Sequence, residues 1–180
     1  KHLIKFNKNK LKYPIVSTVM SNIGLENYIL NKFKVNLKRS SVGDINVIKE
    51  MQKYNSLLGG EQSGHIILSD YSKTGDGILA ALKVTEIITK LKKSTSTIFN
   101  LYDNSPQIKI NIPFKKISKN TVNYIKNINK KKLKDKNMRL LIRLSGTEPL
   151  IRILVEGNDL NKVNTIAKNI EKNIRKKLGK

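Results

Sequence analysis

MRLLIRLSGTEPLIRILV, residues 138–155, is the stretch that decides the fold of the second half of this chain. Its two apolar runs, 138–144 and 150–155, have the alternation and the aliphatic content of strands, which predicts a hairpin. The connecting loop carries two hydroxyl groups and a glycine, with Arg143 and Arg152 at its ends, and such donors suit a phosphate clamp. The same pattern fits an ordinary surface hairpin with salt-bridged arginines equally well.

Outward from this hairpin, residues 106–180 are predicted to form a smaller α+β domain with an antiparallel sheet and two helices. Glu148 is the single acidic side chain of the loop, so it requires a partner such as Arg152 or a ligand hydroxyl. The other expected elements are a strand at 107–113, a helix at 122–133, and a final helix from Asp159 to a C′ glycine at Gly179.

The first part, residues 1–105, is predicted to be an α/β domain with a mixed, mainly parallel sheet, because strand and helix patterns alternate along it. Asp44 is expected to cap one of its helices. A polar stretch at 94–106 marks the boundary between the two domains. The expected strands are 13–20, 34–38 and 66–68, and the expected helices are 23–33, 44–54 and 78–91.

The formal net charge of +23 raises the question of a nucleic-acid partner. Only five of the 36 basic residues are arginine, the side chain favoured for planar recognition of phosphates and bases, and the lysines are spread over every segment. Aromatic side chains for stacking are few, with four Phe, six Tyr and no Trp. We therefore expect no nucleic-acid partner, and a basic nucleic-acid-binding module is the alternative, which predicts a steep salt dependence of binding.

The composition also argues against several other classes. No run of 18 or more apolar residues occurs, so we expect no membrane partner, and the basic segment 1–12 lacks the features of a signal peptide. Cysteine is absent, which excludes disulfides and thiolate metal sites and fits the cytoplasm. The two histidines lie far apart at His2 and His65, and no Asp-x-Asp spacing occurs, so no metal ligands are predicted in this chain.

Three segments, in this order, resemble the α-D-phosphohexomutase family: STVMSNIGLE at 17–26, GGEQSGH at 59–65 and RLSGTEP at 143–149. From its residues alone, the second segment fits a strand-to-strand turn. The family's usual phosphate-binding loop is Arg-Pro-Ser-Gly-Thr-Glu-Pro, and Leu144 here replaces the proline, which restores a backbone donor. The first segment and Gln62 are similar to the bacterial phosphoglucosamine mutase branch.

The resemblance implies which residues form the site. In the family, the glutamate and serine of the glycine-rich loop contact the hexose ring, so Glu61, Ser63 and His65 are expected to bind the substrate. Glu61 can accept hydrogen bonds from two sugar hydroxyls. His65 is the candidate for assisting proton transfer, and no residue is assigned a principal catalytic role. The expected phosphate-binding residues are Arg143, Ser145, Gly146, Thr147 and Arg152.

Another element, Arg39 with Val42-Gly43-Asp44, resembles the family's Val-Gly-Asp-Arg-Tyr-Val segment. Ile45 and Asn46 stand where arginine and tyrosine are usual, so the role of that arginine is not carried over to this chain. For Asp44, the interpretation as a helix cap has more weight.

Two elements of the family are absent from the chain, namely the phosphorylated serine and the Asp-x-Asp-x-Asp site for Mg²⁺. The resemblance therefore implies the third and fourth domains of a longer enzyme, with Mg²⁺ and the upstream domains as its partners. The implied parent reaction interconverts glucosamine 6-phosphate and glucosamine 1-phosphate through a phosphoserine enzyme and a bisphosphate, for amino-sugar nucleotide and cell-wall precursor synthesis. This chain alone is expected to bind the phosphosugar without turnover. A phosphomannomutase or phosphoglucomutase is the alternative.

Overall fold

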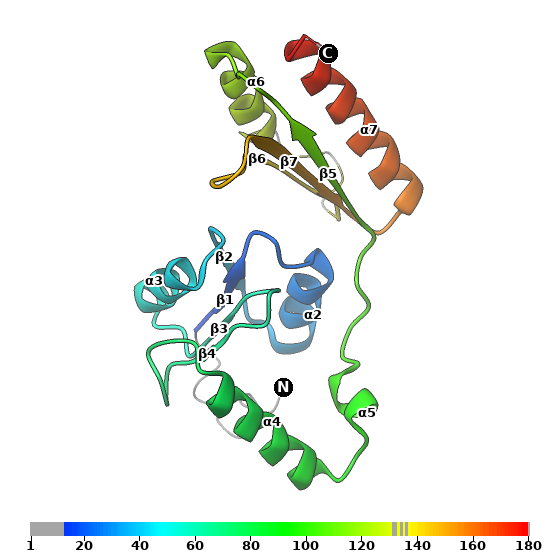
Figure 1. Ribbon diagram of the computed structural model, residues 1–180. Helices are drawn as coiled ribbons and strands as arrows, with labels where there is room; N and C mark the ends of the chain where they lie inside the picture. Colours follow the sequence, from blue (N-terminus) through cyan, green and yellow to red (C-terminus); the bar gives the residue numbers. More distant parts are fainter. Residues whose placement is uncertain (1–12, 131–132, 134, 136, 180) are drawn as a thin grey trace. The chain divides into compact units, whose positions relative to one another are not determined.

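The computed structural model describes residues 13–130, 133, 135 and 137–179, and the chain divides into two compact units (Figure 1). The first unit ends at Asp103 and the second begins at Asn104. Each unit contains its own cluster of buried hydrophobic side chains. Among the described residues, no helix is long and apolar enough to cross a membrane.

The first unit is built on a four-stranded sheet with the strand order β2-β1-β3-β4. β1 (Ile15–Thr18) pairs in parallel with β2 (Leu37–Ser40) and β3 (Leu58–Gly60), whereas β4 (Ile66–Leu68) is antiparallel to β3. The expected mixed, mainly parallel α/β fold is confirmed. β3 is an additional strand that the sequence pattern does not predict, because two of its three residues are glycine.

Polar side chains cap most of the described helices of this unit. The Asn22 side chain accepts a hydrogen bond from Gly24 N–H at 2.8 Å, and the Asp76 side chain accepts one from Leu79 N–H at 2.9 Å. A short helix that was not expected lies within the polar stretch 94–106. The described helices are α2 (Ile23–Phe33), α3 (Asp44–Tyr54), α4 (Gly77–Leu91) and α5 (Thr95–Phe99).

The predicted capping role of Asp44 is wrong. Gly43 occupies the N-cap position of α3 with φ 116°, and Asp44 is the first helical residue, whose carboxylate accepts a hydrogen bond from Ile45 N–H at 2.8 Å. Glycine reaches this positive φ without a β-carbon clash, so the chain turns at Gly43. The charge of Asp44 lies in the first turn of α3, where it interacts favourably with the helix dipole.

α3 packs directly on the sheet of the first unit. Val47 and Met51 of this helix form a buried cluster with Val16 of β1 and Ile67 of β4. Gly59 of β3 makes this approach sterically feasible, because a β-carbon there would lie 2.2 Å from the Met51 sulfur. Gly59 therefore has a packing role besides any role in binding.

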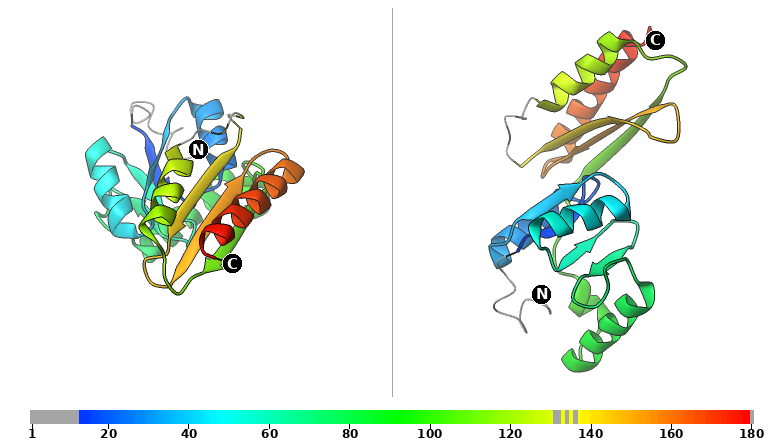
Figure 2. Two further views of the ribbon diagram at one scale, coloured as in Figure 1. Left: turned by 90° about the horizontal axis from the view of Figure 1, so that it is seen from above. Right: turned by 90° about the vertical axis from the view of Figure 1, so that its left-hand side faces the viewer.

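The second unit is a three-stranded antiparallel sheet with two helices on one face (Figure 2). The strand order is β5-β7-β6, and Asp159 caps the last helix by accepting hydrogen bonds from Asn161 N–H and Lys162 N–H. The expected α+β fold is confirmed. Its elements are β5 (Gln107–Pro113), α6 (Lys119–Lys130), β6 (Arg139–Leu144), β7 (Leu150–Glu156) and α7 (Leu160–Lys177).

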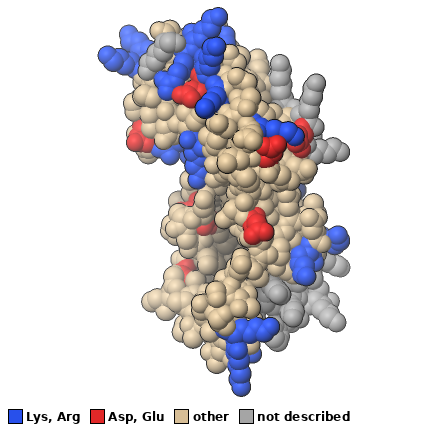
Figure 3. Space-filling model, turned by 90° about the vertical axis from the view of Figure 1, so that its right-hand side faces the viewer, with Lys and Arg blue, Asp and Glu red and all other residues tan. Residues whose placement is uncertain are grey.

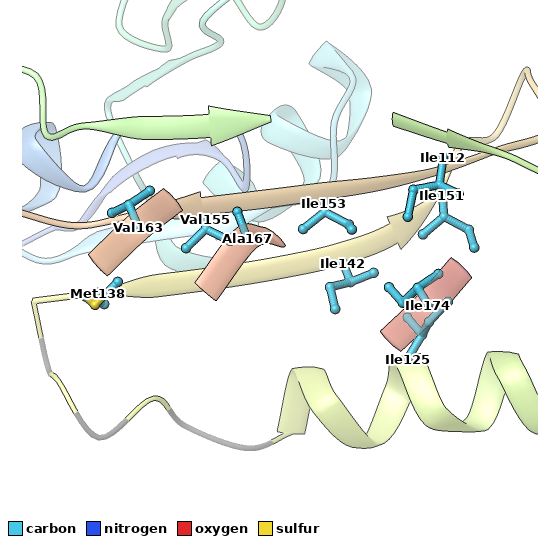
Figure 4. Close-up of a cluster of buried hydrophobic side chains, with 10 residues drawn as sticks. All are labelled: Ile112, Ile125, Met138, Ile142, Ile151, Ile153, Val155, Val163, Ala167 and Ile174. Carbon is cyan, nitrogen blue, oxygen red and sulfur yellow. The ribbon is translucent and has the colours of Figure 1, made fainter. Parts of the chain in front are cut away.

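The core of the second unit lies between this sheet and its helices (Figure 4). Because successive side chains of a strand point to opposite faces, the helix-facing residues place Arg143 and Arg152 on the other face of the sheet. The apolar alternation of 138–155 thus determines the face that carries the two arginines. The buried cluster consists of Ile112, Ile125, Met138, Ile142, Ile151, Ile153, Val155, Val163, Ala167 and Ile174.

Candidate functional site

Three of the segments singled out in the sequence meet at one edge of the first unit's sheet. β1, β2 and β3 are parallel, so their carboxyl ends share an edge, which is where ligands bind in open α/β sheets. The segments 19–22, 41–43 and 61–65 follow these three strands. The fold therefore gathers residues that are widely separated in the sequence into one candidate binding edge.

The Glu61 side chain lies at this edge, on the turn that follows β3. The 61–65 segment is a tight turn between β3 and β4, closed by a hydrogen bond from Glu61 N–H to the His65 carbonyl at 2.9 Å. The Glu61 side chain is 7% exposed, and its Oε1 accepts a hydrogen bond from Gly43 N–H at 2.9 Å. One carboxylate oxygen is thus held by the protein, and Oε2 retains lone pairs for a ligand hydroxyl.

Ser63 and His65 lie on the exposed side of the same turn. The Nδ1 atom of His65 is 3.3 Å from the Ser63 hydroxyl oxygen and 3.4 Å from Glu61 Oε2. The structure therefore brings the three expected ring-binding residues together within one turn. Their donors and acceptors suit a ligand that carries neighbouring hydroxyl groups.

The expected phosphate-binding residues lie in the second unit, on the turn between β6 and β7. Ser145 N–H donates to the Leu150 carbonyl at 2.8 Å, so this backbone donor closes the turn. Gly146 and Thr147 are exposed, and within the described residues their N–H groups have no hydrogen-bond acceptor. The turn thus presents backbone donors and a threonine hydroxyl to solvent at its tip.

The two arginines of the loop stand directly opposite each other in the β6–β7 register. Arg152 forms an ion pair with Glu148, the partner expected from the sequence. The Nε atoms of Arg143 and Arg152 are both buried and lack a hydrogen-bond partner in the described part of the chain. Burial lowers the pKa of the Arg143 guanidinium, and the positive charge of Arg152 lowers it further.

An anion would resolve both of these unfavourable features. Buried donors without partners are rare in native proteins, and two adjacent like charges repel. A phosphate group has several acceptor oxygens and a negative charge, so it can satisfy the donors and screen the repulsion at once.

Arg39, by contrast, is fully engaged within the protein. Its side chain is 14% exposed, pairs with Glu26 and donates to the carbonyls of Ser21 and Thr18. This arginine stabilises the loop after β1 and is not available as a ligand-binding cation.

Sequence reasoning missed other residues of these sites. Asn111 of β5 lies opposite Arg152 and adds a polar side chain to the same row, a position that the alternation of 107–113 could have revealed. Ser17 and Ser21 join the edge of the first unit through hydroxyl hydrogen bonds. Among the described residues, no group of three or more His, Cys, Asp or Glu side chains could hold a metal ion.

The two halves of the chain match two models of one protein family. Residues 1–105 match the family model described as "Phosphoglucomutase/phosphomannomutase, alpha/beta/alpha domain III". Residues 101–173 match "Phosphoglucomutase/phosphomannomutase, C-terminal domain".

Similar curated proteins are bacterial enzymes named phosphoglucosamine mutase. The chain is 43% identical to the protein of Fusobacterium nucleatum subsp. nucleatum over 180 residues, which is 96% of this chain and 39% of the relative. It is 40% identical to the protein of Campylobacter jejuni strain RM1221 over 173 residues, which is 95% of this chain and 38% of the relative. The chain thus spans about two fifths of the length of the curated relatives that it matches.

Solved structures share the fold at low sequence identity. An Aspergillus fumigatus N-acetylphosphoglucosamine mutase in complex with GlcNAc-6P and magnesium aligns with TM-score 0.74 at 15% identity, over 98% of this chain and 41% of that one. An N-acetylglucosamine-phosphate mutase in its substrate complex aligns with TM-score 0.66 at 20% identity, over 92% of this chain and 39% of that one.

Proposed function

We propose, from the premise that this chain belongs to the phosphoglucomutase/phosphomannomutase family, that it supplies the sugar-binding and phosphate-binding parts of a phosphoglucosamine mutase. In this proposal, residues 1–105 bind the hexose ring through Glu61, Ser63 and His65. Residues 106–180 bind the phosphate that is not reacting, through Arg143, Arg152 and the tip of the loop.

The observation that carries the proposal is the pair of opposed arginines with buried, unpartnered Nε atoms. All five arginines lie in the described part of the chain, and four of them form ion pairs with glutamates. Arg143 is the exception, although it lies on strand β6 in a partly buried position. A cation placed in this way is suited to an external anion.

The proposed reaction interconverts glucosamine 6-phosphate and glucosamine 1-phosphate. A phosphoserine of the longer enzyme gives its phosphoryl group to the free sugar hydroxyl, which forms a bisphosphate, and the other phosphate then returns to the serine. Positioning supplies much of the catalysis in phosphoryl transfer, so a clamp on the non-reacting phosphate and a contact on the ring are useful contributions of this chain.

In this proposal, Mg²⁺ is bound by the longer enzyme and not by residues of this chain. Carboxylates are the protein ligands that Mg²⁺ favours, and the described residues contain no suitable cluster. No step assigned to this chain uses the ion.

The pairing of the arginines argues against the nucleic-acid alternative. On the face shown in Figure 3, lysine and arginine side chains stand in separate groups divided by uncharged surface. Four of the five arginines are already paired with glutamates, which leaves few guanidinium groups for phosphate or base recognition.

The test is a calorimetric titration of the purified chain with glucosamine 6-phosphate at physiological salt, with glucosamine and inorganic phosphate as controls. Saturable binding that requires both the sugar and the phosphate is the expected result. Binding no tighter than that of inorganic phosphate would contradict the proposal. Competition with mannose 6-phosphate and glucose 6-phosphate tests the related-mutase alternative, and turnover by the chain alone would refute its purely binding role.

A further inference from the structure

A chain of side-chain hydrogen bonds runs beneath the turn that carries Glu61. The Ser17 hydroxyl donates to the Gly60 carbonyl at 2.8 Å, and the hydroxyl oxygens of Ser17 and Ser21 are in hydrogen-bond contact. A serine hydroxyl carries one proton, and that of Ser17 goes to Gly60. Ser21 is therefore the donor to Ser17, and the chain has a defined direction from Ser21 through Ser17 to Gly60.

The acceptor in this chain belongs to the peptide group that enters Glu61. The Gly60 carbonyl and the Glu61 N–H are the two ends of one planar peptide unit. Ser17 holds the oxygen end, while the His65 carbonyl holds the N–H end at 2.9 Å. With both ends held, the direction in which the Glu61 side chain leaves the backbone is determined.

The neighbouring loops are connected to the same peptide. Arg39 of β2 donates to the Ser21 carbonyl at 2.6 Å, which stabilises the loop after β1. The Glu61 carboxylate accepts from Gly43 N–H at 2.9 Å, which joins the loop after β2. All three loops of the candidate binding edge are therefore linked through Ser17 and Glu61.

The two serine hydroxyls are buried, which strengthens their hydrogen bonds within the protein. Ser17 is 6% exposed and Ser21 is 4% exposed, so water competes poorly for their hydroxyl groups. A buried polar group that loses its partner is costly, which holds the chain of hydrogen bonds in one arrangement.

We propose that Ser17 is a positioning residue that aims Glu61 at the hexose ring, through its hydrogen bond to the Gly60 carbonyl. The ligand part of this inference rests on the proposed function, whereas the positioning part is independent of it. Ser21 and Arg39 orient the Ser17 hydroxyl, and no direct contact between Ser17 and the ligand is involved.

The chain offers a matched control for a Ser17→Ala substitution. Ser56 is also a buried serine, and its hydroxyl donates to another carbonyl of β3, that of Leu58, at 3.0 Å. It lies at the opposite end of the strand from Glu61. Ser17→Ala and Ser56→Ala therefore each remove a hydroxyl group that donates to a carbonyl of β3, at Gly60 and at Leu58 respectively.

The first measurement is amide hydrogen exchange by NMR on the full chain. Ser17→Ala is expected to speed exchange at the Glu61 and Gly43 amides by about tenfold or more, the effect of losing one stabilising hydrogen bond. Ser56→Ala should leave both amides protected. Ser21→Ala should have a smaller effect on the Glu61 amide than Ser17→Ala, because Ser17 retains its own proton for Gly60. Wild-type protection of both amides in Ser17→Ala would overturn the proposal.

The second measurement separates positioning from a merely structural role. Ser17→Ala should weaken glucosamine 6-phosphate binding about tenfold and leave inorganic phosphate binding unchanged. Ser17→Thr, which restores the hydroxyl, should recover the sugar-dependent part. Equal weakening of both ligands would overturn the proposal. A wild-type chain that does not bind the phosphosugar would instead contradict the proposed function, and the exchange measurement still decides the role of Ser17.

Discussion

Replacing Arg143 with alanine tests the phosphate clamp most directly. Arg143 faces Arg152 across the β6–β7 pair, and its Nε is buried without a partner. Burial, and then the neighbouring charge of Arg152, lower the pKa of Arg143. The charged guanidinium therefore lowers the stability of the protein when no ligand is bound. We therefore expect Arg143→Ala to bind phosphosugar less tightly and to be at least as resistant to unfolding as the wild type.

The magnitude follows from the interactions that are lost. A hydrogen bond to a charged group contributes about 1.5–3 kcal/mol. Since about 1.4 kcal/mol corresponds to a tenfold change in affinity, the dissociation constant for glucosamine 6-phosphate should rise roughly 10- to 150-fold. In the wild type, a bound phosphate also screens the repulsion between Arg143 and Arg152. Arg143→Ala loses this gain on binding, so the effect adds to the expected rise in the dissociation constant.

The assay is calorimetric titration paired with thermal unfolding, and Arg175→Ala is the matched control. Arg175 is paired with Glu171 on α7, so its removal changes the net charge equally without touching the loop. The control should bind within about twofold of the wild type, as expected for a screened surface charge. Unchanged affinity in Arg143→Ala, or equal weakening in both variants, would refute the clamp.

Further expectations concern stability, glycine packing and pH. Ile151→Ala, at a fully buried position, should cost about 2–5 kcal/mol in denaturant unfolding of the second unit, and a loss below about 1 kcal/mol would contradict its core role. Gly59→Ala should lower the melting temperature because its β-carbon would meet a methionine sulfur at 2.2 Å, whereas Gly146→Ala, in open space, should melt normally and bind phosphosugar less tightly; a normally melting Gly59→Ala would disprove the packing argument. Hydrogen bonds from lysines, first from Lys83, lower the pKa of Glu86 to about 2, so its contribution to stability is present at neutral pH and is lost as the pH falls toward 2. Glu86→Gln should therefore lose less stability than the wild type between pH 7 and pH 3, and identical melting profiles would exclude this contribution.

The local sequence pattern predicted the strands and helices whose apolar residues recur at a regular spacing. The hairpin at 138–155 and the final helix after Asp159 appear as strands β6 and β7 and helix α7, because their apolar periodicity matches the face that they bury. The Leu58–Gly60 strand escaped prediction, since glycine has no strand-forming side chain and its extended conformation is imposed by pairing with β1 and β4.

The corrected cap of α3 has a similar cause. An aspartate followed by an apolar helical pattern is a common cap signal, and the sequence favours Asp44 in that role. The hydrogen bond from Gly43 N–H to Glu61 joins residues 18 positions apart and helps to place the turn at the glycine. No local pattern contains that contact.

The sequence by itself determined the two fold classes, the face of the hairpin that carries its arginines, and the types of side chain available for binding. These properties depend on periodicity and on residue chemistry, which are local. Only the tertiary structure decided that Arg143 faces Arg152, that Glu61 reaches Gly43, and that Ser17 holds the Gly60 carbonyl 43 positions away. Such partners are selected by strand register and by the cost of burying an unpaired polar group, and both arise only when distant segments pack together.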